Sequence, residues 1–97
     1  MGLPVHFDRL KDRDPEFYDL LLSLKELAHG PGVLDAKAKY LIGLAINASL
    51  ERTDKVRCAL GQAWAAGATD EEVHEVLRLT YFIKGLSTAQ LIADAVK

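Results

Sequence analysis

The most constraining feature of this 97-residue chain is an apolar stretch near its middle, at residues 41–50. Asp35 is suited to cap a helix that ends at about Leu50. After Tyr40 the apolar residues of this helix lie on every side instead of forming one stripe. Such a helix has to be buried all round, whereas a chain this short buries only a limited share of its surface. The pattern therefore predicts that a second copy covers part of this helix.

Helix start and stop signals divide the rest of the chain, and no strand-like alternation or internal repeat is present. Asp14-Pro15 marks a helix start, and Gly30 is suited to a left-handed residue after that helix. We predict an all-α fold, a compact bundle of about five helices, as a single domain over residues 1–97. The expected segments are an irregular N-terminal arm at 1–13 and helices at 15–29, 35–50, 53–67, 69–85 and 87–96, the last capped by Ser87.

The strongest local signal lies between the third and fourth predicted helices. Gly67 can close one helix, while Thr69 and Glu72 form the capping box of the next. The acidic run at residues 70–72 also places negative charge at the positive end of the helix dipole. The sequence therefore predicts a turn in which Gly67 ends one helix and Thr69 starts the next.

Composition excludes several functional classes. Lys plus Arg is 12 and Asp plus Glu is 14, so no basic excess favours nucleic-acid binding. The single cysteine, Cys58, excludes an internal disulfide framework and an all-cysteine zinc site. No secretory signal is visible, and the longest apolar stretch is about half a membrane span. We therefore expect a cytoplasmic protein that uses neither nucleic acid nor a membrane as a partner.

The predicted third helix has two contrasting apolar faces. A strip of small residues allows another helix to approach closely, and Trp64 beside it offers a large anchor. We expect this strip to join an interface between copies; the alternative is that it faces solvent. One face consists of Val56, Leu60, Ala63 and Gly67, and the opposite strip consists of Cys58, Gly61 and Ala65.

Four segments in order carry a family resemblance: Leu34-Asp35-Ala36-Lys37, Leu41-Ile42-Gly43-Leu44-Ala45, the turn from Ala65 to Val73, and Lys84-Gly85-Leu86. Together they resemble the carboxymuconolactone decarboxylase-like family, which includes the alkylhydroperoxidase D branch. The resemblance covers residues 34–97. It implies an all-helical, obligate homo-oligomer that assembles through its central helices as a trimer or hexamer.

The resemblance also implies a peroxidase chemistry whose groups this chain lacks. In that branch a Glu and a His lower the pKa of a thiol, the thiolate attacks peroxide, and a second Cys resolves the product as a disulfide. The matching positions here are Tyr40 for the Glu, Arg52 and Lys55 for the Cys-x-x-Cys pair, and Ala59 for the His. The chain therefore resembles a degenerate member. The decarboxylase branch keeps a His at the position of Ala59, so its acid–base group is also missing.

Cys58 and Tyr40 are the candidate catalytic residues. Cys58 lies near a helix N-terminus with Lys55 and Arg57 close in sequence, which favours a lowered thiol pKa. A one-residue shift of the alignment would place Cys58 at the position of the family's His. The alternative is that Cys58 is a small packing residue at an interface.

Two further polar features have structural and functional readings. Tyr40 and Asn47 are seven residues apart and share a helix face, where they line a pocket or bond to a neighbouring helix. His74 lies near Glu71 and Glu75, a spacing that holds a metal only with ligands from elsewhere. A solvated charged face is the commoner arrangement. We therefore expect no metal and no cofactor.

Two function classes follow. One is an oligomeric helical scaffold with a small-molecule pocket and without the disulfide peroxidase machinery. The other is an enzyme of altered chemistry, either alkylhydroperoxide reduction through Cys58 or lactone decarboxylase-type proton transfer. A third class, an accessory protein docking with a redox partner, comes from family context alone. The expected partners are further copies of the chain and a small-molecule ligand.

Overall fold

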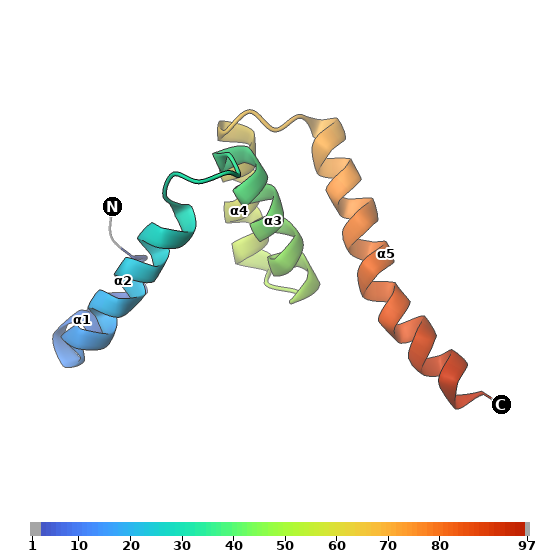
Figure 1. Ribbon diagram of the computed structural model, residues 1–97, viewed down its shortest axis with the longest axis horizontal. Coiled ribbons are helices and arrows are strands. Elements are labelled where there is room, and N and C mark those ends of the chain that lie inside the picture. The colour runs from blue at the N-terminus through green and yellow to red at the C-terminus, as the bar shows by residue number, and fades with distance from the viewer. Residues whose placement is uncertain (1–2, 97) are drawn as a thin grey trace. The chain divides into compact units, whose positions relative to one another are not determined.

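A computed structural model describes residues 3–96, and this range contains helices and turns without any strand (Figure 1). The helices are η1 (Val5–Phe7), α1 (Asp8–Arg13), α2 (Pro15–His29), α3 (Ala36–Ser49), α4 (Thr53–Ala65) and α5 (Asp70–Ala95). The predicted all-α class with about five helices is confirmed. The chain forms two compact units, one ending at Leu34 and one beginning at Asp35. Within residues 3–96 no helix has both the length and the hydropathy needed to cross a bilayer.

The first unit corrects two sequence predictions. Residues 5–13 are helical instead of an irregular arm, and α1 packs on α2 with Tyr18 buried between them. Asp14 caps α2 as expected, accepting a 3.3 Å hydrogen bond from the backbone N–H of Phe17. Gly30 is extended, with φ −71°, and not left-handed. Its requirement for glycine is steric, because a Cβ there would lie 2.5 Å from the carbonyl oxygen of Glu26.

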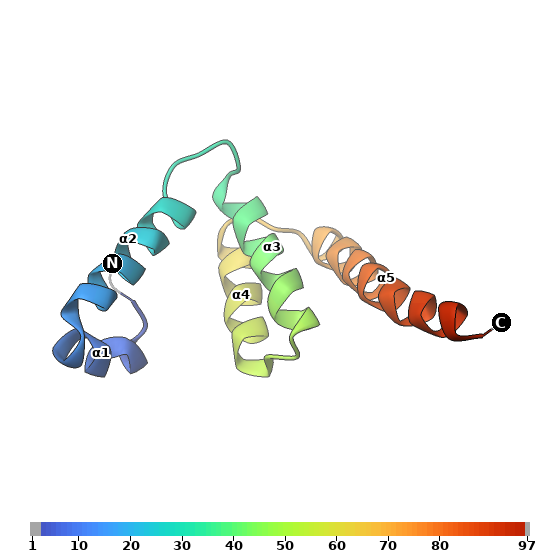
Figure 2. The same ribbon diagram turned by 60° about the horizontal axis from the view of Figure 1, so that its bottom comes forward.

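The second unit is built on a hairpin of α3 and α4, which lie side by side in both ribbon views (Figures 1 and 2). Asp35 caps α3 by accepting a 2.8 Å hydrogen bond from the backbone N–H of Ala38. Leu44, Ala59 and Ala63 are buried, and Ala63 has no exposed surface. Small alanines let the two helices approach closely, so a short segment forms a tight contact.

The turn before α5 forms as predicted, but the helix itself is longer. Gly67 adopts φ +97° after α4, and Thr69 and Glu72 form the capping box. The predicted break at Gly85 and the predicted cap at Ser87 are wrong, because α5 continues through both residues to Ala95. One glycine costs a helix only about 1 kcal/mol, which helix-forming neighbours on both sides offset.

Candidate functional site

Two polar contacts, here called the clamps, join α3 to α5. The Nζ of Lys37 lies 2.9 Å from the Oε2 of Glu72, and the Nζ of Lys84 donates a 2.7 Å hydrogen bond to the carbonyl oxygen of Ser49. Lys37 and Ser49 are twelve residues apart on α3, as Glu72 and Lys84 are on α5. Both intervals therefore correspond to about 18 Å of helix. It follows that α3 and α5 run parallel, with one clamp near each end of α3.

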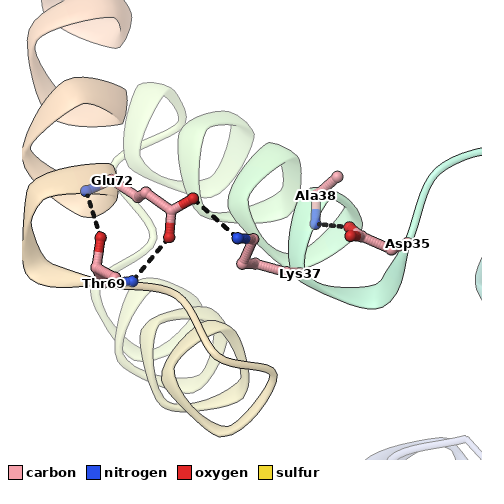
Figure 3. A network of polar contacts seen from close by, with 5 residues as sticks. All are labelled: Asp35, Lys37, Ala38, Thr69 and Glu72. Atoms are coloured by element: carbon pink, nitrogen blue, oxygen red, sulfur yellow. Dashed lines mark hydrogen bonds and ion pairs between the residues drawn. The ribbon is translucent and has the colours of Figure 1, made fainter.

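The first clamp is continuous with the capping box of α5 (Figure 3). The Thr69 backbone N–H donates to Oε1 of Glu72 at 2.9 Å, and the Glu72 backbone N–H donates to Oγ1 of Thr69 at 3.1 Å. The Thr69 N–H and then the side chain of Lys37 hold the pKa of Glu72 below its ordinary value. Hydrogen bonding to Glu72 and its charge raise the pKa of Lys37. One carboxylate thus caps α5 and binds α3.

The second clamp places a cation at the carbonyl end of α3. Ser49 is the last residue of that helix, where carbonyl oxygens lack intrahelical partners and the helix dipole is negative. The ammonium of Lys84 supplies both a hydrogen bond and a complementary charge. Sequence reasoning missed this contact because its partners lie 35 residues apart and neither has a distinctive neighbourhood.

Between the clamps lies an apolar groove of about 580 Å³, here called the α3–α5 groove. Aliphatic side chains of both helices line it, and the clamp residues Ser49 and Lys84 lie at one end. The groove is an open depression because α5 has no buried residue. Its lining consists of Leu41, Ile42, Ala45, Ile46 and Ser49 from α3, and Val76, Leu79, Thr80, Ile83, Lys84 and Ser87 from α5.

A smaller cavity of about 280 Å³, here called the three-helix pocket, is lined by α3, α4 and α5. Its walls are mainly aliphatic, while Thr80, Tyr81 and Lys84 supply polar groups. An apolar cavity with a few polar groups can hold and orient a small molecule. The full lining is Leu44, Ala45, Ala48, Val56, Leu60, Val73, Val76, Leu77, Thr80, Tyr81 and Lys84.

The predicted catalytic candidates lie outside both linings. Cys58 is exposed on α4, and Tyr40 is half-buried on α3. The Nδ2 of Asn47 donates a 2.9 Å hydrogen bond to the carbonyl oxygen of Gly43, so its bond is within α3 and not to a neighbouring helix. A catalytic role for Cys58 or Tyr40 stays a prediction.

The remaining predicted features are on the surface. His74 and Glu75 are exposed, and the side chains that the structure describes include no cluster of three His, Cys, Asp or Glu able to hold a metal. Gly61 and Ala65, of the small-residue strip on α4, are exposed, and Trp64 is 49% exposed. The strip lies away from the α3 contact, as its helical positions require.

Large apolar side chains of the second unit are poorly covered. Among the side chains whose burial the structure describes, no large one is less than 2% exposed. From Leu77 onward every large apolar side chain that the structure describes on α5 is exposed, including Tyr81 and Phe82. The α3 residues Ile42 and Ile46 are about half exposed as well. The apolar surface expected from the sequence is therefore present, and the helices of the second unit leave it open.

Comparison with known proteins settles the family. Residues 15–97 match the sequence profile of the carboxymuconolactone decarboxylase family. The chain belongs to this family. It is also 30% identical over 77 residues to the uncharacterised protein MJ1511 of Methanocaldococcus jannaschii, covering 79% of this chain and 72% of that protein. No solved structure matches the chain.

The family match begins at residue 15, whereas the resemblance noted in the sequence begins at residue 34. It follows that α2 belongs to the family domain of this carboxymuconolactone decarboxylase family member. In this added part of the domain, the apolar residues from Phe17 to Ala28 recur at the spacing of one helix face.

Proposed function

We propose that this carboxymuconolactone decarboxylase family member is a self-assembling helical scaffold whose copies cover one another's apolar surfaces. The supporting observation is the exposure of α5, where Tyr81 is 80% and Leu91 is 71% exposed. A contiguous apolar surface of this kind is uncommon on monomers. Closed assembly as a trimer or hexamer removes it from water.

The scaffold carries a binding site for a small, mainly apolar molecule in the three-helix pocket. Its volume of about 280 Å³ is near the lower end of the range for ligand pockets. Leu60 and Val73 contribute apolar surface from α4 and α5, and Thr80 contributes a hydroxyl that can orient a ligand.

The proposal includes the loss of the disulfide peroxidase machinery. Arg52 and Lys55 stand at the positions of the two cysteines, and Tyr40 stands at the position of the Glu. At the position of the His the structure has Ala59, which is buried and supports the contact of α4 with α3. A histidine there would have to displace that packing.

Light scattering coupled to size-exclusion chromatography tests the assembly. We expect a mass that is a multiple of 10.7 kDa at micromolar concentration. A mass of one chain across the same concentrations contradicts the proposal, because a monomer would then tolerate the open surface.

Xenon binding followed by NMR tests the pocket, since xenon enters apolar cavities. We expect shifts of the Leu60 and Val73 methyl signals. Ala48→Leu adds volume to the lining and should abolish these shifts, whereas Ala95→Leu, at the end of α5, should leave them unchanged. Shifts that are absent, or that persist equally in both variants, contradict a pocket site.

A second candidate function is favoured by the exposure of the Cys58 thiol, which peroxide can reach. The thiolate would attack one peroxide oxygen, break the O–O bond and release an alcohol, leaving a sulfenic acid. Two molecules of a low-molecular-weight thiol would then restore Cys58 and leave as a disulfide and water. Peroxide turnover that is abolished in Cys58→Ser would support this candidate against the scaffold. In the same way, lactone turnover abolished in Tyr40→Phe would support proton transfer by Tyr40.

A further inference from the structure

The C-terminal part of α5, residues 85–95, extends beyond the second clamp and is here called the α5 overhang. Ser49 ends α3, and Lys84 lies opposite it, so α5 continues for about 16 Å past α3. Figures 1 and 2 both show α5 leading beyond the α3–α4 hairpin. Ser87, in the first turn of the overhang, still lines the groove beside α3, and the rest of the overhang runs on past the end of that helix.

The composition of the overhang is not that of a helix adapted to water. Asp94 is its single charged residue, and Ile92 is 61% exposed. Leu86, Ala89 and Ile92 follow one another at intervals of three and share one side of the helix. A surface helix usually carries charged residues opposite such a stripe. The overhang instead resembles a helix that is covered by protein.

The α3–α5 groove has the complementary property, since it is apolar and long in the direction of the two helices. Its cations are already engaged, Lys84 by Ser49 and Lys37, next to the groove, by Glu72. A helix that turns the uncharged side of Leu86, Ala89 and Ile92 to this groove therefore fits it without leaving a buried charge unpaired.

We propose that the α5 overhang of a second copy occupies the α3–α5 groove and that the exchange is reciprocal. This inference rests on the proposed self-assembly and names the segment that carries it. Under a two-fold axis each copy donates one overhang and accepts one, so a single contact covers both apolar surfaces in both chains. A stable interface buries about 800 Å² per partner, and two overhangs with two grooves double the contact made by one. One such pair is a dimer and three such pairs make a hexamer, whereas a trimer cannot consist of them.

Substitution on the overhang tests the proposal in the full chain. Ile92→Asp places a charge on the side facing the groove, and Gln90→Asp is the matched control, since residues two positions apart lie on opposite sides of a helix. We expect Ile92→Asp to raise the dissociation constant by about 30-fold or more, as loss of an interface hot spot does. Gln90→Asp should change it less than about threefold. Equal effects in both variants, or none in Ile92→Asp, overturn the inference.

Photo-crosslinking keeps the test decisive if Ile92→Asp fails to fold. A benzophenone amino acid is placed at position 92, or at position 90 as a control, in a mixture of ¹⁵N-labelled and unlabelled chains. We expect position 92 to cross-link between differently labelled chains, to peptides from residues 36–49 and 70–84, and position 90 to do so much less. Cross-links from position 92 to α2, to another overhang, or to no second chain overturn the inference while an oligomeric mass still supports the scaffold. A mass of one chain would overturn both.

Discussion

The α3–α4 hairpin and α5 show two different ways of placing apolar residues in one short chain. The hairpin buries Leu44, Ala59 and Ala63 within its own contact. In contrast, α5 has no buried residue and is fixed to α3 by two polar clamps at Lys37 and Lys84. The difference follows from what joins each helix to its neighbour, because alanines bring α3 and α4 close together while the long side chains of Lys37 and Lys84 hold α5 to α3. The hairpin is therefore packed within the second unit, whereas the helices of that unit leave α5 uncovered.

The largest expected effect concerns the hairpin. Leu44→Ala should lower the free energy of unfolding by about 2–5 kcal/mol, because it removes a side chain that is only 7% exposed and leaves a cavity. Leu50→Ala, on the C-cap of the same helix and 54% exposed, should cost less than half as much. Urea denaturation of both variants measures the difference. Equal losses would show that the hairpin is not the better-packed region.

The next effect concerns α5 and depends on concentration. If α5 is completed by a second copy, the free energy of unfolding of a pair should rise by about 1.4 kcal/mol for each tenfold increase in protein concentration. Thermal unfolding over a range of concentrations measures this rise. An unfolding temperature that does not change with concentration would contradict the covering of α5 by a second copy.

The helix start of α5 has a smaller effect. Thr69→Ala removes the hydroxyl that caps the Glu72 N–H and should destabilise the protein by about 1 kcal/mol. Thr53→Ala is the matched control, since the N-cap of α4 is Arg52 and makes no side-chain capping bond. Chemical denaturation compares the two. A greater loss of stability in Thr53→Ala would contradict the expectation that the capping box of α5 stabilises the protein more than Thr53 at the start of α4 does.

The smallest effect comes from the first clamp, whose side chains are about one-third exposed. The pKa of Glu72 is below its ordinary value of 4.5. The stabilisation that its carboxylate gives to the folded protein is therefore present above pH 4.5 and is lost as the pH falls through the lower pKa of the folded state. The stability difference between the wild type and Glu72→Gln should therefore shrink in acid. Lys37→Gln should raise the Glu72 pKa only in part, because the Thr69 N–H still donates, and NMR titration of the carboxyl carbon checks this. A pKa of Glu72 restored to 4.5 in Lys37→Gln would contradict the leading role of Thr69.

Most helix limits could be predicted because their causes are local. Asp14, Asp35 and the pair Thr69 and Glu72 act on backbone groups within four residues, and these caps form as expected. The failures have equally local reasons. Gly85 lies among residues that continue a helix, and Gly30 is required by a close carbonyl oxygen instead of by a positive φ.

The family and the apolar character of α3 were also accessible from the sequence, since both depend on residue order and helical spacing. The candidate site could not be predicted from the sequence. Cys58 and Tyr40 were chosen by matching family positions, whereas the two cavities are lined by other residues, which only the packing of three helices brings together.

The sequence by itself therefore determined where the helices start, which residues are apolar and which reactive groups are missing, because each is set by a residue and its near neighbours. Tertiary structure alone decided that α5 runs parallel to α3 and leaves an open groove beside it. That arrangement depends on two contacts, Lys37 with Glu72 and Lys84 with Ser49, between residues 35 positions apart. No local pattern records such a pairing, because the free energy of the contact arises only after the chain has brought both helices together.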